Sequence, residues 1–329
     1  MNGDGVLEWR PIERGDAGRW AGLTASIQMA DQNWEYLSEQ DLLEEFDDPF
    51  RDYTRGSAAI FDGGTMIGYG ILTSRSAADP VHDMRYEGGV HPDYRGQGLG
   101  GRLLDWAQQA AVPLHEERYR GRPLRLSGSC LTRNAAAVAL YAAHGYRQVR
   151  WFHAMSRDLE ATLPDVPAPA GVQITGFTPE RAQDALLVRN EAFRDHWNMI
   201  QMTGDGWARF LAYAAFRPTV SFLAYAGDEP LGIIIGHEYD AYQEATGIRD
   251  LYIALIGTRR AGRKRGIASA LLARTLAMAR AEGCTAASLD VDADSPTGAL
   301  SLYERAGFSV RHTSVRQTKT LLPAPLPVP

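Results

Sequence analysis

The sequence predicts a mixed α+β protein in which one fold is repeated along the chain. A glycine-containing turn that leads into an amphipathic helix occurs twice, as "RGQGLGGRLL" and "RKRGIASALL", so that Arg95 matches Arg263 at a separation of 168 residues. A second shared segment follows each copy, "NAAAVALYAAHGY" and "SPTGALSLYERAGF", and matches Tyr141 with Tyr303 at a separation of 162 residues. Two motifs in the same order at nearly the same separation indicate an internal duplication.

The predicted elements follow the same order in both halves. Polar amphipathic helices come first, and a pair of apolar strands follows, at 57–61 and 65–73 in the first half and at 220–226 and 230–237 in the second. A further strand enters the glycine turn, and a helix, a strand, a last helix and a last strand come after it. This order indicates a mixed sheet flanked by helices in each half.

A proline-rich segment lies between the two copies. The stretch "DLEATLPDVPAPAGVQ" has prolines at 164, 167 and 169 and cannot continue a helix or a central strand. We therefore expect an N-terminal domain of residues 1–158, a linker of residues 159–170 and a C-terminal domain of residues 171–329.

Composition and charge limit the classes of protein and partner. The 329 residues, 45% hydrophobic and 22% charged, are ordinary for a globular protein with two domains. The formal net charge of −6 argues against nucleic-acid and membrane-surface partners. Cys130 and Cys284 have no metal or disulfide spacing, the amino terminus lacks a signal-like apolar run, and "LGIIIG" is too short to cross a bilayer. We therefore expect a cytoplasmic protein without a membrane span.

The two turns share a pattern that narrows what they bind. A P-loop requires GxxxxGK[ST], which neither turn has, and the GxGxxG spacing of a dinucleotide-binding turn is approximated by "GQGLGG" but not by "KRGIAS". What both copies have is Arg-x-x-Gly-x-Gly/Ala. Small residues at a helix start let backbone N–H groups approach a phosphate, and the helix dipole adds partial positive charge. The turns therefore predict phosphate sites.

The shared pattern resembles motif A of the GNAT superfamily of N-acetyltransferases, [Gln/Arg]-x-x-Gly-x-[Gly/Ala], and "LYAAHGY" and "LYERAGF" are similar to the family's later "LYxxxGF" helix. The resemblance covers nearly the whole chain. It implies two tandem GNAT-like domains, each with a central mixed, mostly antiparallel sheet, and acetyl-CoA as the cofactor. The implied coenzyme-binding residues are Arg95, Gly96, Gly98 and Gly100 in the first half and Arg263, Lys264, Arg265, Gly266 and Ala268 in the second.

The resemblance also implies an acid and a base. Tyr303, in the "LYxxxGF" position, is expected to protonate the leaving thiolate, and Tyr141 has the same place in the first half. The family often has a glutamate eleven residues before motif A, where this chain has Tyr252 and, in the first half, Met84. Asp250 lies two residues before Tyr252, on the same strand face by alternation, and is the predicted base. In the first half Glu87 falls on the opposite face to Met84 unless that strand is bulged.

The predicted acceptor element is "RNEAFRDHW", in which His196 and Trp197 occupy the region where the family builds its acceptor pocket. The tandem halves are similar to mycothiol synthase-like proteins, in which the C-terminal half carries the chemistry. We therefore expect an N-acetyltransferase that acts on a small-molecule amine, with no nucleic-acid or membrane partner. The alternative is a coenzyme A-binding module with one or both halves catalytically silent.

A metal site is not predicted. "LDVDADS" imitates a calcium loop at Asp290, Asp292 and Asp294, but Ser295 stands where that loop needs glycine and Ser301 where it needs glutamate. The stretch reads better as an alternating strand. The identity of the acceptor, the role of the first half and the oligomeric state stay open at this point.

Overall fold

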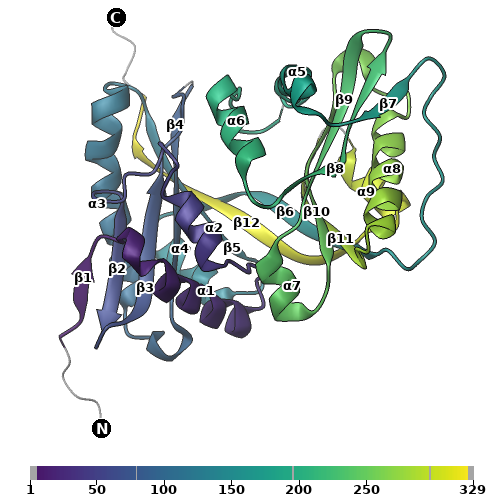
Figure 1. Ribbon diagram of the computed structural model, residues 1–329. Coiled ribbons are helices and arrows are strands. Elements are labelled where there is room, and N and C mark those ends of the chain that lie inside the picture. The colour runs from purple at the N-terminus through teal and green to yellow at the C-terminus, as the bar shows by residue number, and fades with distance from the viewer. Residues whose placement is uncertain (1–5, 79, 195, 296–297, 325–329) are drawn as a thin grey trace, which may run out of the picture. The chain divides into compact units, whose positions relative to one another are not determined.

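A computed structural model describes residues 6–78, 80–194, 196–295 and 298–324 (Figure 1). The chain forms two compact units. Unit 1 consists of residues 1–151 and 314–329, and unit 2 consists of residues 152–313. Each unit has a mixed sheet with helices on both faces, which confirms the predicted fold class.

The sheet of unit 1 is antiparallel except between β4 and β5, which are parallel. Helices α3 and α4 pack on one face of this sheet, and α1 and α2 pack on the other. In spatial order the strands are β1 (Glu8–Arg10), β2 (Ser57–Asp62), β3 (Thr65–Thr73), β4 (His82–Val90), β5 (Leu124–Leu131) and β12 (Ser309–Leu322). The helices are α1 (Ala17–Asp31), α2 (Glu39–Glu45), α3 (Leu99–Tyr119) and α4 (Ala135–Ala143).

Unit 2 repeats this arrangement, with β10 and β11 as its parallel pair. Helices α8 and α9 pack on one face, α5 and α6 pack on the other, and α7 connects β9 to β10. In spatial order the strands are β6 (Arg147–Asp158), β11 (Ala286–Asp292), β10 (Asp250–Thr258), β9 (Glu229–His237), β8 (Phe216–Ala226) and β7 (Gln173–Gly176). The helices are α5 (Ala182–Ala192), α6 (Gly204–Ala212), α7 (Asp240–Thr246), α8 (Ile267–Ala281) and α9 (Ala299–Arg305).

The last strand of each half belongs to the other unit's sheet. Residues 152–158 of β6 pair with β11 in unit 2, and residues 314–322 of β12 pair with β5 in unit 1. The compact units therefore divide within β6 and within β12, whereas the sequence suggests a division at residues 159–170. That proline-rich segment lies wholly in unit 2, where Leu159 is fully buried and Leu163 packs against the core. Proline content marks irregular backbone but does not show which sheet a neighbouring strand joins.

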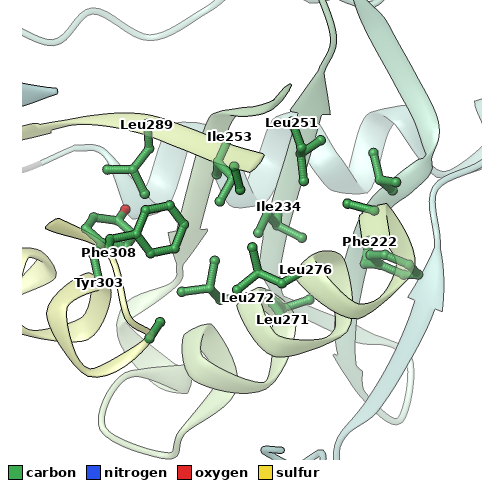
Figure 2. Packing of buried hydrophobic residues seen from close by; sticks show 14 of the residues in the cluster. Phe222, Ile234, Leu251, Ile253, Leu271, Leu272, Leu276, Leu289, Tyr303 and Phe308 are labelled. Carbon is green, nitrogen blue, oxygen red and sulfur yellow. The ribbon is translucent and has the colours of Figure 1, made fainter. Parts of the chain in front are cut away.

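The core of unit 2 holds the strands of the site in place. Figure 2 shows Leu271, Leu272 and Leu276 of α8 against the strand residues Leu251 and Ile253, all at most 4% exposed. Each of these side chains contributes roughly 1.5–3 kcal/mol through removal from water.

Within the described residues, no helix is long and apolar enough to span a membrane.

Candidate active site

Both glycine turns have the same backbone conformation. The φ angles of Gly96 and Gly98 are 76° and 79°, and those of Lys264 and Gly266 are 61° and 82°. These are left-handed values, which glycine adopts without strain and lysine does only at some cost. The repetition of this unusual backbone confirms that the two motifs are structural copies.

Each turn ends at a helix start with an exposed glycine. Gly98 and Gly266 are the N-cap residues of α3 and α8, and at neither position is there a side-chain cap or an acidic residue in the first turn. A Cβ built on Gly98 meets nothing within 4 Å, and one on Gly266 meets only Pro169 Cγ, at 3.8 Å. Orphan N–H groups at an open, positively polarised helix end fit the pyrophosphate of a coenzyme.

The first arginine of each motif supports the turn through its side chain. Arg95 Nε donates to the Val90 carbonyl at 3.2 Å, and its guanidinium forms two hydrogen bonds with Asp31 at 2.7 and 3.0 Å. Arg263 donates in the same way to the Thr258 carbonyl at 3.4 Å and to the carbonyl of Ala192 at 3.1 Å. Each arginine therefore joins a strand end to the C-terminus of a helix. Both residues were predicted to bind the coenzyme. With these contacts their role would be indirect, because each arginine fixes the shape of the turn.

Lys264 and Arg265 extend the second turn with positive charge. Both residues are exposed, and they stand where the first turn has Gly96 and Gln97. The second turn therefore has two exposed cations at positions where the first turn has uncharged residues. Gly100 has a packing role as well, because a Cβ there would lie 3.0 Å from Leu140 Cδ2 of α4, whereas the second half has Ala268 at this position.

In each unit the two parallel strands diverge as they approach the turn. β10 and β11 pair from Asp250 and Ala286 to Tyr252 and Ser288, but β10 continues to Thr258. In unit 1 the last parallel pair is Arg85 with Ser127. The unpaired ends of the two strands, which we call the opening, lie on the side from which the chain enters the glycine turn.

A bulge distinguishes the site strand of unit 2 from that of unit 1. The register of β10 against β9 shifts between Ile253 and Leu255, whereas β4 pairs with β3 without a shift from Arg85 to Val90. Ile253 packs under α8, and Leu255 packs against the α5 and α6 cluster, so the extra residue moves later side chains to the other face.

Because of the bulge, counting back from motif A finds different strand positions in the two halves. Met84 was predicted to match Tyr252, but Met84 is fully buried in the cluster under α3. Because β4 lacks the extra residue of the bulge, the position that matches Tyr252 is Arg85, and the position that matches Asp250 is Asp83. The prediction that the first half lacks a matching carboxylate is therefore wrong, although Asp83 accepts a hydrogen bond from Arg125 at 3.1 Å.

The two tyrosines of the "LYxxxGF" helices lie in the cores beside the openings. Tyr303 is 6% exposed and packs edge-on against Phe308, with ring centroids 6.0 Å apart, and Figure 2 shows both rings close to Leu289 of β11. Burial raises the pKa of Tyr303 well above its ordinary value, so the phenol keeps its proton at neutral pH. Tyr141 is equally buried, and its hydroxyl lies over Gly128 of β5.

Asp250 lies where β10 and β11 are still paired. Its Oδ2 accepts a hydrogen bond from the Ser288 hydroxyl, and within the described residues its buried Oδ1 has no hydrogen-bond partner. Burial raises the pKa of Asp250, and the Ser288 hydrogen bond and the charge of Arg311 oppose this rise. One oxygen of this carboxyl is therefore buried, and the other is held by a hydrogen bond.

The predicted acceptor element lies at the other end of β10. The His196 ring stacks at a tilt on Phe193, with centroids 4.6 Å apart, and a Cβ on Gly257 would touch the Phe193 ring at 2.9 Å. Asn190 holds the following loop through hydrogen bonds of 3.0 and 2.8 Å to the backbone of Met202. Trp197 is half-buried in this loop. Gly257, at the end of β10 near His196, is seven residues from Asp250, and a strand rises roughly 3.3 Å per residue. The structure therefore does not bring His196 and Asp250 together.

Sequence profiles and relatives agree on the family. The profile "Acetyltransferase (GNAT) family" matches residues 188–308, and "Acetyltransferase (GNAT) domain" matches residues 56–148. Mycothiol acetyltransferase of Thermobispora bispora is 32% identical over 256 residues, covering 76% of this chain and 79% of the relative. The chain belongs to the GNAT acetyltransferase family. Mycothiol acetyltransferase of Salinispora arenicola is 31% identical over 258 residues, covering 75% of each chain.

Solved structures share the fold over nearly the whole chain. A GCN5-related N-acetyltransferase from Sphaerobacter thermophilus superposes with a TM-score of 0.77 and 26% identity over 97% of both chains. A tandem GNAT protein from the clavulanic acid biosynthesis pathway gives a TM-score of 0.69 at 16% identity, covering 97% of this chain and 100% of the other, which shows the fold alone. This GNAT acetyltransferase therefore has the predicted two domains in tandem.

One hydrogen-bonded pair of residues in this GNAT acetyltransferase was not predicted from the sequence. The Tyr252 hydroxyl donates to Asp290 Oδ2 at 3.0 Å, across the gap between β10 and β11, and Asp290 is exposed. The alternation of "LDVDADS" indicates that Ser288 and Asp290 share a face, as they do. The sequence contains no signal for their partner on β10, because that depends on the register between two distant strands.

Proposed function

We propose that the protein transfers an acetyl group from acetyl-CoA to the amine of a small molecule, and that unit 2 carries out the chemistry. The observation that carries this proposal is the opening between β10 and β11, which leads from a protonated, buried Tyr303 to a helix start flanked by Lys264 and Arg265. The name of the relatives, mycothiol acetyltransferase, supports a small-molecule acceptor.

The residues of unit 2 have separate tasks in this reaction. The N–H groups from Arg265 to Ala268 would bind the pyrophosphate, with the two exposed cations beside them. Acetyl-CoA, when bound, supplies the thioester. Tyr303 would give its proton to the departing thiolate, because a neutral phenol can protonate a thiolate. A carboxylate between β10 and β11 would take the proton of the amine.

Unit 1 has features that favour coenzyme binding without turnover. Its strand β4 lacks the bulge, and the carboxylates on that strand are already paired, Asp83 with Arg125 and Glu87 with Arg51 and Arg85. We propose that its turn still binds coenzyme A, because the backbone of that turn is the same. The free cysteines fit a reducing compartment, so we place the reaction in the cytoplasm.

Thiol release in the presence of acetyl-CoA tests the proposed reaction. A panel of small amines is supplied with the full-length protein and acetyl-CoA, and free thiol is measured with a chromogenic disulfide. We expect at least one amine to accelerate thiol release above the rate without an acceptor. If no amine does so while calorimetry still detects coenzyme A binding, the protein is a coenzyme-binding module instead.

A further inference from the structure

The strand-four position that commonly carries a glutamate in this family holds Tyr252, and a carboxylate reaches the same place from the neighbouring strand. Tyr252 and Asp290 are joined by a 3.0 Å hydrogen bond between the ends of their side chains. We propose that Asp290 of β11, rather than Asp250, accepts the proton of the acceptor amine. This inference rests on the proposed acetyltransferase function of unit 2.

The strand register favours Asp290 over Asp250. Tyr252 and Ser288 form the last parallel pair, so Asp290 lies two residues beyond it, inside the opening, and Asp250 lies two residues before it, within the paired part. Leu289 and Val291 point into the α8 core, which places Asp290 on the opposite face. The Asp290 side chain is exposed, whereas one oxygen of Asp250 is buried and the other accepts the Ser288 hydrogen bond. An amine can reach Asp290 without displacing any element of the sheet.

Tyr252 is a positioning residue in this arrangement. Its hydroxyl donates to Oδ2 of Asp290, which leaves Oδ1 as the acceptor for the substrate. Tyr303 belongs to the same core cluster as Leu289, the residue that precedes Asp290 on β11. The base and the acid therefore lie next to the same segment of β11, on opposite faces of the sheet.

The proton transfers balance with this assignment. The acceptor arrives as an ammonium ion and gives one proton to Asp290, which later passes it to solvent. The nitrogen lone pair then forms the N–C bond to the thioester carbonyl carbon, and the C–S bond breaks. Tyr303 protonates the leaving sulfur and regains a proton from the second N–H through solvent, so the products are an amide and a free thiol.

The same position in unit 1 cannot perform this step. The last parallel pair there is Arg85 with Ser127, so the residues that match Tyr252 and Asp290 are Arg85 and Ser129. An arginine at this position would repel an ammonium ion, and a serine hydroxyl is too weak a base to deprotonate one. The base that we assign therefore exists only in unit 2. This conclusion follows from the parallel pairs and does not depend on the bulge.

Asn and Glu substitutions test the assignment in the full-length protein, with the best amine from the thiol-release panel. We expect Asp290→Asn to lower kcat/KM for the amine about a hundredfold at pH 7. The loss should shrink about tenfold for each pH unit above pH 7 and disappear by about pH 9, because the free form of an amine with a pKa of about 10 becomes more abundant and needs no base. Asp290→Glu should retain more activity than Asp290→Asn, and Tyr252→Phe should cost about tenfold. Unchanged coenzyme A affinity by calorimetry shows that the fold is intact.

Asp250→Asn is the matched control, because it makes the same change on the neighbouring strand. We expect it to keep kcat/KM within about threefold of the parent. A parent-like Asp290→Asn beside an inactive Asp250→Asn overturns the assignment and leaves the proposed function standing. A loss in Asp290→Asn that is the same at every pH also overturns it. Absence of thiol release with every amine removes the proposed function itself, and the assignment with it.

Discussion

At the scale of single residues, the proposed chemistry depends on Tyr303, a phenol that the core both encloses and keeps protonated. Tyr303→Phe retains the ring, its edge-on contact with Phe308 and its place beside Leu289, but it removes the proton. We expect kcat to fall about a hundredfold or more, because a positioned acid is typically worth that much. Coenzyme A affinity and the unfolding midpoint should stay near those of the parent.

Tyr141→Phe is the matched control, since Tyr141 has the same position in unit 1 and is 7% exposed. It should leave kcat unchanged within about twofold. Steady-state kinetics of both variants decide between the units. A fully active Tyr303→Phe protein beside an impaired Tyr141→Phe protein would place the chemistry in unit 1.

A buried histidine makes the stability of unit 2 depend on pH. His237 is 2% exposed, it packs on Phe210 with centroids 5.1 Å apart, and within the described residues its Nε2 has no hydrogen-bond partner. Burial, with a smaller effect of Arg217, lowers its pKa to about 4. Because this value lies below the unfolded pKa of about 6.5, the contribution to stability is complete above pH 6.5 and is lost as the pH falls toward 4.

His237→Phe should remove this dependence. A phenyl ring fits the aromatic surroundings and cannot be protonated, so the free energy of unfolding should match the parent near pH 7.5. At pH 4.5 it should exceed that of the parent by about 2 kcal/mol. Urea unfolding at the two pH values measures both differences. An equal difference at pH 7.5 and pH 4.5 would mean that packing, and not protonation, accounts for the effect.

At the scale of elements, the helix starts are the features that the two units share. Gly98→Glu and Gly266→Glu each place a negative side chain in front of a helix N-terminus, so each should remove one coenzyme A site. Gly→Ala at the same positions is the control, because it adds only left-handed strain of about 1–2 kcal/mol and no charge. Calorimetry counts the sites. A parent with one site that only the Gly266 variant loses would leave unit 1 without a coenzyme site.

The sequence predicted the elements well because each is encoded locally. The two turns, the helices after them and the strand that contains Asp290 all follow from patterns within about ten residues. The bulge between Ile253 and Leu255 does not, because it exists only relative to the register of β9. One inserted residue moved the count from motif A to the other face of β4 and hid the match of Asp83 with Asp250. The Tyr252–Asp290 pair depends on the register between β10 and β11, which are distant in the sequence.

At the scale of the whole molecule, the exchange of last strands changes what a cut in the proline-rich segment does. Residues 159–170 are irregular and remain the predicted first site of proteolysis. The ends of the segment are held in unit 2, where Leu159 donates its N–H to Thr285 and Val172 donates to Pro169, both at 2.9 Å. The cut fragments each keep a strand in the other's sheet. We expect the nicked protein to elute as one species in size-exclusion chromatography and to separate only in denaturant. Early cuts within residues 33–40 would place the accessible region elsewhere.

The same topology predicts that neither half folds by itself. A chain of residues 1–165 lacks the β12 segment that pairs with β5, and a chain of residues 166–329 lacks the β6 segment that pairs with β11. Each would expose the unpaired backbone groups of a strand that is central in the intact sheet, which favours aggregation.

Expressed alone, both halves should be largely insoluble. Expressed together, they should give a soluble 1:1 complex that binds coenzyme A like the intact chain. A half that is soluble, monomeric and able to bind coenzyme A without its partner would show that the exchanged strand is dispensable, and that the division at residues 159–170 is the one that governs folding.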